Sequence, residues 1–281
     1  MKFTLLFSFL FLVFTIKAQK QNTPVEFIYK VTETDSLSAF VFYPDNVLEK
    51  ESIPAVAIFH GGGWAMGKPS WGFGYAADYA EKGLVAISVQ YRLSDQKSIT
   101  PIDAMEDAQD FFLWLRENAA SMKVHRDSIA AFGWSAGGHL VSSASVFPKY
   151  STDSSFNSSP NVLILQSPAV SPVNDTWFTQ LLLDKGEAKK YSPAQHIKEN
   201  MPPTIIVVGK EDTVTPACYS ELFRDNMLQK QNLCELYIYE GVGHLFTPAH
   251  LSDKGYPQPD PEVSKKAFAQ VDKFLMALGY F

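Results

Sequence analysis

Cysteine and clustered basic residues are both scarce in this chain. Two cysteines occur among the 281 residues, so at most one internal disulfide could form. Lysine and arginine number 24 against 30 acidic residues, for a net charge of -6, and they form no basic block. Binding to phosphates needs such a block, so nucleic acid is not expected as a partner. No HExxH or paired CxxC pattern is present, so we expect neither a metal nor another cofactor.

One apolar run stands out in length, from Phe3 to Ile16, with Lys2 before it and Ala18 after it. Its length and its lack of a polar face are typical of a secretory signal peptide that is cleaved after Ala18. At ~1.5 Å per residue the run covers only about two thirds of a ~30 Å hydrocarbon core, which argues against stable membrane insertion. We therefore predict a signal peptide over residues 1–18, export to the periplasm or the medium, and one domain over residues 19–281.

Short apolar runs alternate with helical patterns through the rest of the chain. Two early segments, 25–31 and 37–43, predict an antiparallel hairpin. Six later runs suit strands that are buried on both faces: residues 55–59, 84–89, 129–132, 162–165, 205–208 and 236–239. Helical periodicity is clearest over residues 102–119 and 263–278. This order predicts an α/β fold with a mostly parallel sheet covered by helices on both faces, in which residues 149–203 are an irregular insertion.

The two cysteines are expected to be separated by a helix. The pattern predicts this helix from Pro216 to about Gln229, with Cys218 near its start and Cys234 in the strand beyond its end. A helix of that length spans ~20 Å, far more than the ~7 Å between Cα atoms that a disulfide can bridge. We predict two free, buried thiols.

The segment IAAFGWSAGGHL places a serine at a sharp turn between a buried strand and a helix. Gly133 and Gly137 flank Ser135 two positions away on either side. Residues without side chains at these places let strand and helix approach closely, which holds the serine hydroxyl outward in a strained turn. The pattern predicts that Ser135 is a nucleophile. Because a serine hydroxyl is weakly nucleophilic at neutral pH, a base and an orienting acid must lie nearby.

Candidates for the acid and the base follow two later strands. Asp212 comes after the strand TIIVVG, and His244 comes after the strand ELYIYE. Functional groups gather at the carboxyl ends of strands in open α/β sheets, so Ser135, Asp212 and His244 are predicted to meet at one edge. Glu211 is the rival acid, but its side chain would point the other way if the strand continues through it.

The glycine triplet Gly61–Gly63 ends another buried strand. Glycine weakens a strand, so its presence here indicates a special backbone conformation or a close approach to the main chain. Attack of the serine on an ester carbonyl places negative charge on the carbonyl oxygen, and fixed N–H donors must face that oxygen. The backbone of Ala136 supplies one donor. Gly62 and Gly63 are the favoured further donors, because a loop without side chains lets the substrate reach the main chain; Gly61 and Trp64 remain alternatives. The backbone amides of Gly62, Gly63 and Ala136 would form an oxyanion hole.

Five motifs together resemble the α/β-hydrolase superfamily: HGGGW, SVQYRLS, GWSAGGHL, GKEDTVTP and GVGHLF. The similarity is to its esterase branch, which includes hormone-sensitive-lipase-like carboxylesterases and bacterial feruloyl and acetyl-xylan esterases. It runs from about Ala55 onward. The resemblance implies the α/β-hydrolase fold, a serine ester hydrolase, and the roles already given to Ser135, Asp212 and His244. Trp134 stands where many hormone-sensitive-lipase-like members carry an acidic residue, which shifts the similarity toward the smaller polysaccharide-esterase and peptidase-like relatives.

The choice of substrate rests on tryptophans and on the predicted export. Trp64, Trp71 and Trp134 flank the predicted oxyanion loop or the nucleophile. Aromatic faces at these places suit a sugar or a phenolic acyl group through stacking, although they could instead fill the core. We predict that Trp64 and Trp134 bind an acyl-carbohydrate ester, either an acetyl- or a feruloyl-polysaccharide.

Three other functions stay open. A general short-chain carboxylesterase or lipase-like enzyme would use the same residues. A prolyl-oligopeptidase-like peptidase is disfavoured, because only about 36 residues lie between Ala18 and Ala55, where such peptidases normally carry a large β-propeller. The leading segment also reads as strands, so we expect a short insertion and no large helical cap over the site. A non-catalytic small-molecule binding protein of this fold would characteristically lack the base, and His244 is present.

Overall fold

Eight strands form one sheet in the computed structural model, which describes residues 23–281 except positions 34, 153 and 252–254. The strands follow the order β1-β2-β4-β3-β5-β6-β7-β8. Their bounds are β1 Val25–Val31, β2 Ser36–Phe42, β3 Ile53–Phe59, β4 Val85–Val89, β5 Val124–Trp134, β6 Val162–Gln166, β7 Thr204–Gly209 and β8 Cys234–Tyr239. The predicted signal peptide, residues 1–18, lies outside the described residues.

The sheet confirms the predicted α/β fold. β1 pairs with β2, and β2 with β4, in antiparallel fashion. The pairs from β4 through β3, β5, β6 and β7 to β8 are all parallel. Each segment that the apolar runs predicted is a strand. β5 begins at Val124, earlier than predicted, because polar residues at positions 125–128, three of them exposed, interrupt the apolar run.

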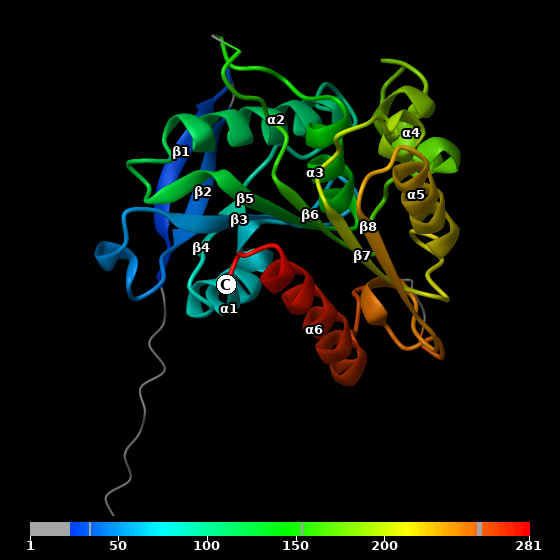
Figure 1. The fold of residues 1–281 in the computed structure, drawn as a ribbon. Coiled ribbons are helices and arrows are strands. Elements are labelled where there is room, and N and C mark those ends of the chain that lie inside the picture. Colours follow the sequence, from blue (N-terminus) through cyan, green and yellow to red (C-terminus); the bar gives the residue numbers. More distant parts are fainter. Residues whose placement is uncertain (1–22, 34, 153, 252–254) are drawn as a thin grey trace, which may run out of the picture.

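Helices cover the sheet on both faces (Figure 1), with α2, α3 and α5 on one face and α1 and α6 on the other. The helices are α1 Phe73–Glu81, α2 Pro101–Glu117, α3 Ala136–Val146, α4 Thr176–Leu181, α5 Ala217–Gln229 and α6 Pro261–Ala277. β3 shows how the sheet separates two cores. Ala57 and Phe59 pack with the α2 and α3 side, whereas Val56 and Ile58 pack with the α1 and α6 side. Burial on both faces explains the continuous apolar runs of the inner strands.

The insertion between β6 and β7 is short, as predicted. Within the described residues it contains α4 and three 3₁₀ helices: η3 Pro172–Asn174, η4 Ala188–Tyr191 and η5 Pro193–His196. No large cap domain is present among the described residues. A search of the same residues for a helix long and apolar enough to span a membrane found none.

The cysteines are only partly where the sequence placed them. Both are free, and Cys234 is buried as predicted; burial raises the pKa of its thiol to about 12. The prediction that Cys218 is buried is wrong, because this residue is exposed. α5 buries Ala217, Ser220 and Phe223 along one stripe, and the next residue after Ala217 turns about 100° away from that stripe.

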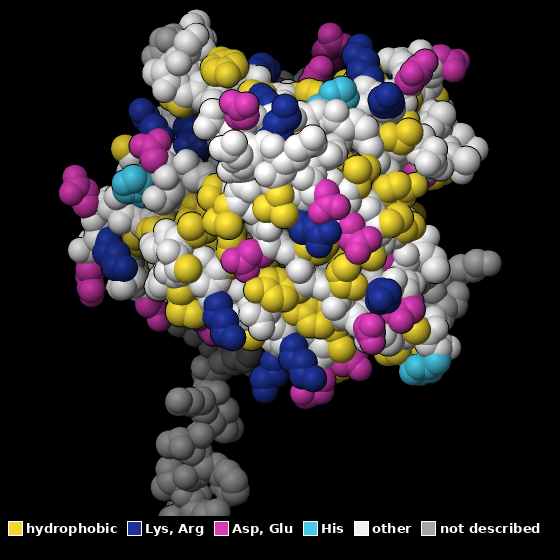
Figure 2. All heavy atoms as spheres, turned by 45° about the vertical axis from the view of Figure 1, so that its right-hand side comes forward, with side chains coloured by type: hydrophobic (Ala, Val, Ile, Leu, Met, Phe, Trp, Pro, Cys, Tyr) yellow, Lys and Arg dark blue, Asp and Glu magenta, His cyan; other side chains and the backbone are white. Residues whose placement is uncertain are grey.

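Charged side chains of both signs are mixed on the surface drawn in Figure 2. Lysine and arginine side chains stand among acidic and hydrophobic ones on this face and do not form one continuous basic area. Interspersed charges of both signs are typical of an ordinary solvated surface.

Candidate active site

Ser135 lies at the turn between β5 and α3, in a strained backbone conformation with φ 53° and ψ -122°. The two flanking glycines are required by close backbone packing. A Cβ on Gly133 would lie 2.4 Å from the carbonyl oxygen of Gly137, and a Cβ on Gly137 would lie 2.0 Å from that of Phe59. Such contacts are far inside van der Waals distance. The predicted reason for the G-x-S-x-G spacing is therefore confirmed by the packing.

The structure brings Ser135, His244 and Asp212 together in a chain of hydrogen-bonding groups. The Oγ of Ser135 lies 3.2 Å from Nε2 of His244. The Nδ1 of His244 lies 3.0 Å from Oδ2 and 3.2 Å from Oδ1 of Asp212. All three residues are buried. This geometry lets an N–H at Nδ1 face the carboxylate while Nε2 accepts the serine proton.

Asp212 is held by the start of the segment that leads into α5. Its Oδ1 accepts hydrogen bonds from the backbone N–H groups of Val214 and Thr215, at 3.0 and 2.7 Å. The Thr215 hydroxyl lies 2.9 Å from Oδ2 and 3.2 Å from His244 Nδ1. These contacts fix both carboxylate oxygens. The rival Glu211 is exposed, whereas Asp212 is 5% exposed.

The predicted oxyanion loop has the backbone shape that glycine permits. Gly62 and Gly63 have φ values of 121° and 56°, which cost other residues free energy. Within the described part of the chain, no acceptor is hydrogen-bonded to the backbone N–H of Gly62, Gly63 or Ala136. Ala136 is also the first residue of α3, so the positive end of the helix dipole lies at this place. These N–H groups are available to a ligand.

His60 holds the start of the oxyanion loop in place. Its Nδ1 lies 2.7 Å from the carbonyl oxygen of Gly61, and its carbonyl accepts a hydrogen bond from the Tyr91 hydroxyl at 2.7 Å. The imidazole stacks on the Tyr91 ring. Burial lowers the pKa of His60 to about 4, so the ring is neutral near pH 7.

Trp64 and Trp134, the predicted substrate-binding tryptophans, are both buried. Trp64 is 2% exposed, and its indole N–H donates to Nδ1 of His139 at 3.1 Å. Trp134 is 7% exposed and packs against Phe132 and Tyr75. Both rings therefore have protein neighbours that cover much of their faces. Contact between either ring and a substrate stays a prediction.

A different tryptophan lies open beside the loop. Trp177, in α4, is 36% exposed, and its indole N–H donates to the carbonyl oxygen of Gly63 at 2.9 Å. Met66 and Trp71 are exposed in the same loop region. Sequence reasoning missed Trp177 because the insertion has no regular periodicity. A usable signal was Asp175, whose side chain caps α4 through the N–H of Phe178.

The comparison with protein families gives one match, to a family described as alpha/beta hydrolase fold, over residues 56–248. This range includes the five segments that carry the resemblance and contains Ser135, Asp212 and His244. It covers more than half of the chain.

Two curated relatives of this chain are named as esterases. An acetylxylan esterase of Xylanibacter ruminicola is 26% identical over 249 residues, which is 84% of this chain and 48% of that protein. A probable isoprenylcysteine alpha-carbonyl methylesterase of Oryza sativa subsp. japonica is 24% identical over 68% of this chain and 50% of its own length. The chain thus spans about half the length of these curated relatives.

A solved structure matches over nearly its whole length. Esterase 2 of Thermogutta terrifontis, phosphoramylated by tabun, superposes with a TM-score of 0.81 at 27% identity, covering 92% of this chain and 96% of that one. The same esterase with propionate bound gives a TM-score of 0.79 at 28% identity, covering 92% and 95%.

Proposed function

Because the chain belongs to the family with the alpha/beta hydrolase fold, we propose that it is a serine esterase that cleaves carboxylic esters through an acyl-enzyme. One observation carries the proposal. Ser135, His244 and Asp212 form a buried hydrogen-bonded series beside backbone N–H groups that have no partner in the described chain. These are the parts that acyl transfer requires.

Each group in the site has a defined step. His244 Nε2 takes the proton of Ser135 as Oγ bonds to the ester carbonyl carbon, and Asp212 stabilises the resulting imidazolium. The N–H groups of Ala136, Gly62 and Gly63 hold the oxyanion. Collapse breaks the bond to the alcohol, which leaves with the proton from His244. Water then attacks the acyl-enzyme with the same base, releasing the acid and restoring the Ser135 hydroxyl.

We propose an acyl-carbohydrate ester as the substrate, with an acetyl group as the acyl part. The match to an acetylxylan esterase over 84% of this chain supports this choice. The exposed Trp177 beside Gly63 adds an aromatic face at the loop, of the kind that stacks on sugars. Export through residues 1–18 belongs to the same proposal, because a polymeric substrate lies outside the cell.

A short-chain carboxylesterase of broad alcohol range is the second candidate. It is favoured by the similar esterase whose structure holds propionate. Both candidates share the acyl-enzyme and differ only in the alcohol part of the ester.

Product release from four esters separates these candidates. We expect the purified chain to hydrolyse p-nitrophenyl acetate and to release acetate from acetylated xylan, with a higher kcat/KM for the carbohydrate ester. A higher kcat/KM for p-nitrophenyl butyrate than for any carbohydrate ester would favour the second candidate. Ferulate release from methyl ferulate above acetate release would replace acetyl by feruloyl. No hydrolysis of any of the four would overturn the esterase proposal.

Replacing Trp64 by phenylalanine tests whether this buried ring contacts the substrate or supports the packing around His139. The change leaves the buried Nδ1 of His139 without its donor, which costs about 1–3 kcal/mol and lowers the melting temperature by roughly 2–4 °C for each kcal/mol. His139 Nε2 stays bound to the carbonyl of Tyr191. We expect kcat/KM for p-nitrophenyl acetate and for acetylated xylan to fall together.

The matched control is Trp114→Phe. Trp114 is partly buried in α2 and contacts Phe27 and Tyr29, away from the oxyanion loop. We expect this variant to keep both rates. A selective loss for acetylated xylan in Trp64→Phe, with an unchanged melting temperature, would restore direct contact between Trp64 and the sugar.

A further inference from the structure

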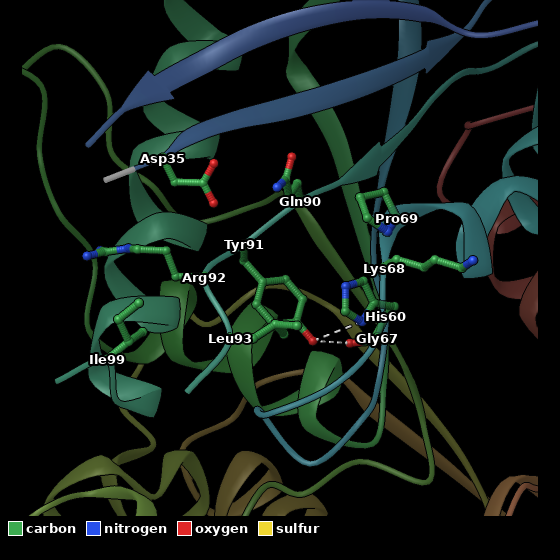
Figure 3. Close-up of a pocket in the computed structure, with 10 residues that line it drawn as sticks. All are labelled: Asp35, His60, Gly67, Lys68, Pro69, Gln90, Tyr91, Arg92, Leu93 and Ile99. Atoms are coloured by element: carbon green, nitrogen blue, oxygen red, sulfur yellow. Dashed lines mark hydrogen bonds between the residues drawn. The ribbon is translucent and has the colours of Figure 1, made fainter. Parts of the chain in front are cut away.

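A cavity of about 320 Å³ (Figure 3) lies over strands next to the one that carries the nucleophile, at the same edge of the sheet. Its walls come from the loops after β3 and β4 and from the turn between β1 and β2. They consist of Asp35, His60, Gly67, Lys68, Pro69, Gln90, Tyr91, Arg92, Leu93 and Ile99. The volume is at the lower end of the range for small-molecule sites.

His60 adds an imidazole to the lining of this cavity. The residue is 2% exposed, and its Nδ1 faces the carbonyl oxygen of Gly61 at 2.7 Å. A proton on Nδ1 is needed for that contact, so Nε2 carries a lone pair. Nε2 makes no hydrogen bond with any residue that the structure describes. Figure 3 shows the imidazole beside Tyr91, with Gln90 and Pro69 around the same space. A donor group of a ligand can therefore bind at Nε2.

The other polar groups add donors and a second acceptor. Gln90 uses its Oε1 to accept from the N–H of Ser38, which leaves its amide N–H groups for a ligand. Lys68 and Asp35 are exposed at the cavity and carry opposite charges. Arg92 adds no free charge, because its guanidinium pairs with two acidic side chains, Asp103 at 3.0 Å and Asp107 at 2.8 Å. The lining is thus balanced in charge.

This lining matches a neutral polyhydroxyl ligand. A sugar hydroxyl both donates and accepts, so it can serve His60 Nε2 and the Gln90 amide at once. Leu93, Ile99 and Pro69 supply apolar surface for the C–H groups of a sugar ring. An anionic ligand gains no net attraction here, because the Asp35 carboxylate offsets the Lys68 ammonium and the Arg92 guanidinium is already paired.

The cavity is close enough to the nucleophile for one chain to occupy both places. β3 is the direct neighbour of β5, which carries Ser135, and β4 is the next strand beyond β3. Strands lie about 4.8 Å apart, so the walls of the cavity lie one to three spacings from the strand that carries Ser135, or roughly 5–15 Å. We propose that this cavity is a subsite for a neutral sugar unit of an oligosaccharide ester whose acylated unit lies at Ser135, an inference that rests on the proposed function.

Filling the cavity with Ile99→Trp tests the subsite without touching the triad or the oxyanion loop. We expect kcat/KM for an acetylated xylo-oligosaccharide to fall about tenfold, the loss of one to two hydrogen bonds. The rate on p-nitrophenyl acetate, which is too small to reach the cavity, stays within about twofold. Leu48→Trp is the matched control, since Leu48 is 86% exposed and lies outside the lining, and we expect it to keep both rates.

A binding measurement tests whether the cavity binds a sugar, without relying on turnover. Calorimetric titration of the full chain with unacylated xylotriose should give saturable binding that is weakened at least about fivefold by Ile99→Trp. Gln90→Glu, which keeps the acceptor for Ser38 and removes the N–H donors, should weaken it as well. Equal xylotriose binding by all variants, no binding by the unchanged chain, or preference for glucuronate over xylotriose would overturn the subsite. Failure to hydrolyse any of the four esters would overturn the esterase proposal, while xylotriose binding would still test the cavity.

Discussion

Replacement of Ser135 by alanine is expected to lower kcat for p-nitrophenyl acetate by about 10⁶-fold, the loss typical of removing the serine of a triad. The reason is chemical, since no other group in the site can form the acyl-enzyme. His244 would keep its contact with Asp212 but would have no hydroxyl proton to accept. Labelling by a fluorophosphonate, which traps the same hydroxyl, should disappear with the activity.

Ser142→Ala is the matched control for this experiment. Ser142 lies in α3, is fully buried, and has a hydroxyl with no hydrogen-bond partner in the described chain. Its removal should leave the rate and the labelling unchanged. Fluorophosphonate labelling that persists in Ser135→Ala would show that the nucleophile is another residue.

Replacement of Asp212 by asparagine is expected to lower kcat on the order of 10⁴-fold. An amide can turn its NH₂ toward Nδ1 of His244, which favours the tautomer that cannot accept the proton of Ser135. The two backbone donors at Oδ1 can still bind the amide oxygen, so the fold should persist. Steady-state kinetics and a melting curve on the same preparation separate the chemical from the structural effect.

Glu211→Gln provides the comparison at the adjacent position. Glu211 is exposed, and its backbone N–H binds the carbonyl of Val242, a contact that the change preserves. We expect kcat to stay within about twofold. Equal losses in Asp212→Asn and Glu211→Gln would move the acid of the site to another residue.

The fold was predictable because burial on both faces leaves a clear pattern. The inner strands appear as apolar runs, and helices α2 and α6 show the period of an amphipathic helix. The early part of β5 escaped prediction because polar residues at positions 125–128, three of them exposed, interrupt the apolar run. Cys218 was misplaced for a related reason, since a single position next to a helix start carries no periodic signal of its own.

The parts of the site that local chain geometry fixes were predictable from the sequence. The parts that depend on packing between distant segments were not. Gly133, Ser135 and Gly137 are constrained by a local turn, and the carboxyl ends of the strands place Asp212 and His244. Nothing local requires the Trp64 ring to meet His139, or Trp177 to reach the carbonyl of Gly63. These contacts join segments 75 and 114 residues apart, so they appear only once the chain is folded.

The strand order also sets when the enzyme becomes competent during its synthesis. Ser135 and His244 are 109 residues apart, and a ribosome adds about 5–20 residues per second, so roughly 5–20 s pass between them. Throughout that interval the nascent chain holds a nucleophile without its base. β8, which precedes His244, has β7 as its one neighbour among the described strands of the sheet and is made after all of them. Ester cleavage therefore starts only when this edge strand joins the sheet. The unfinished polypeptide cannot cleave esters before then.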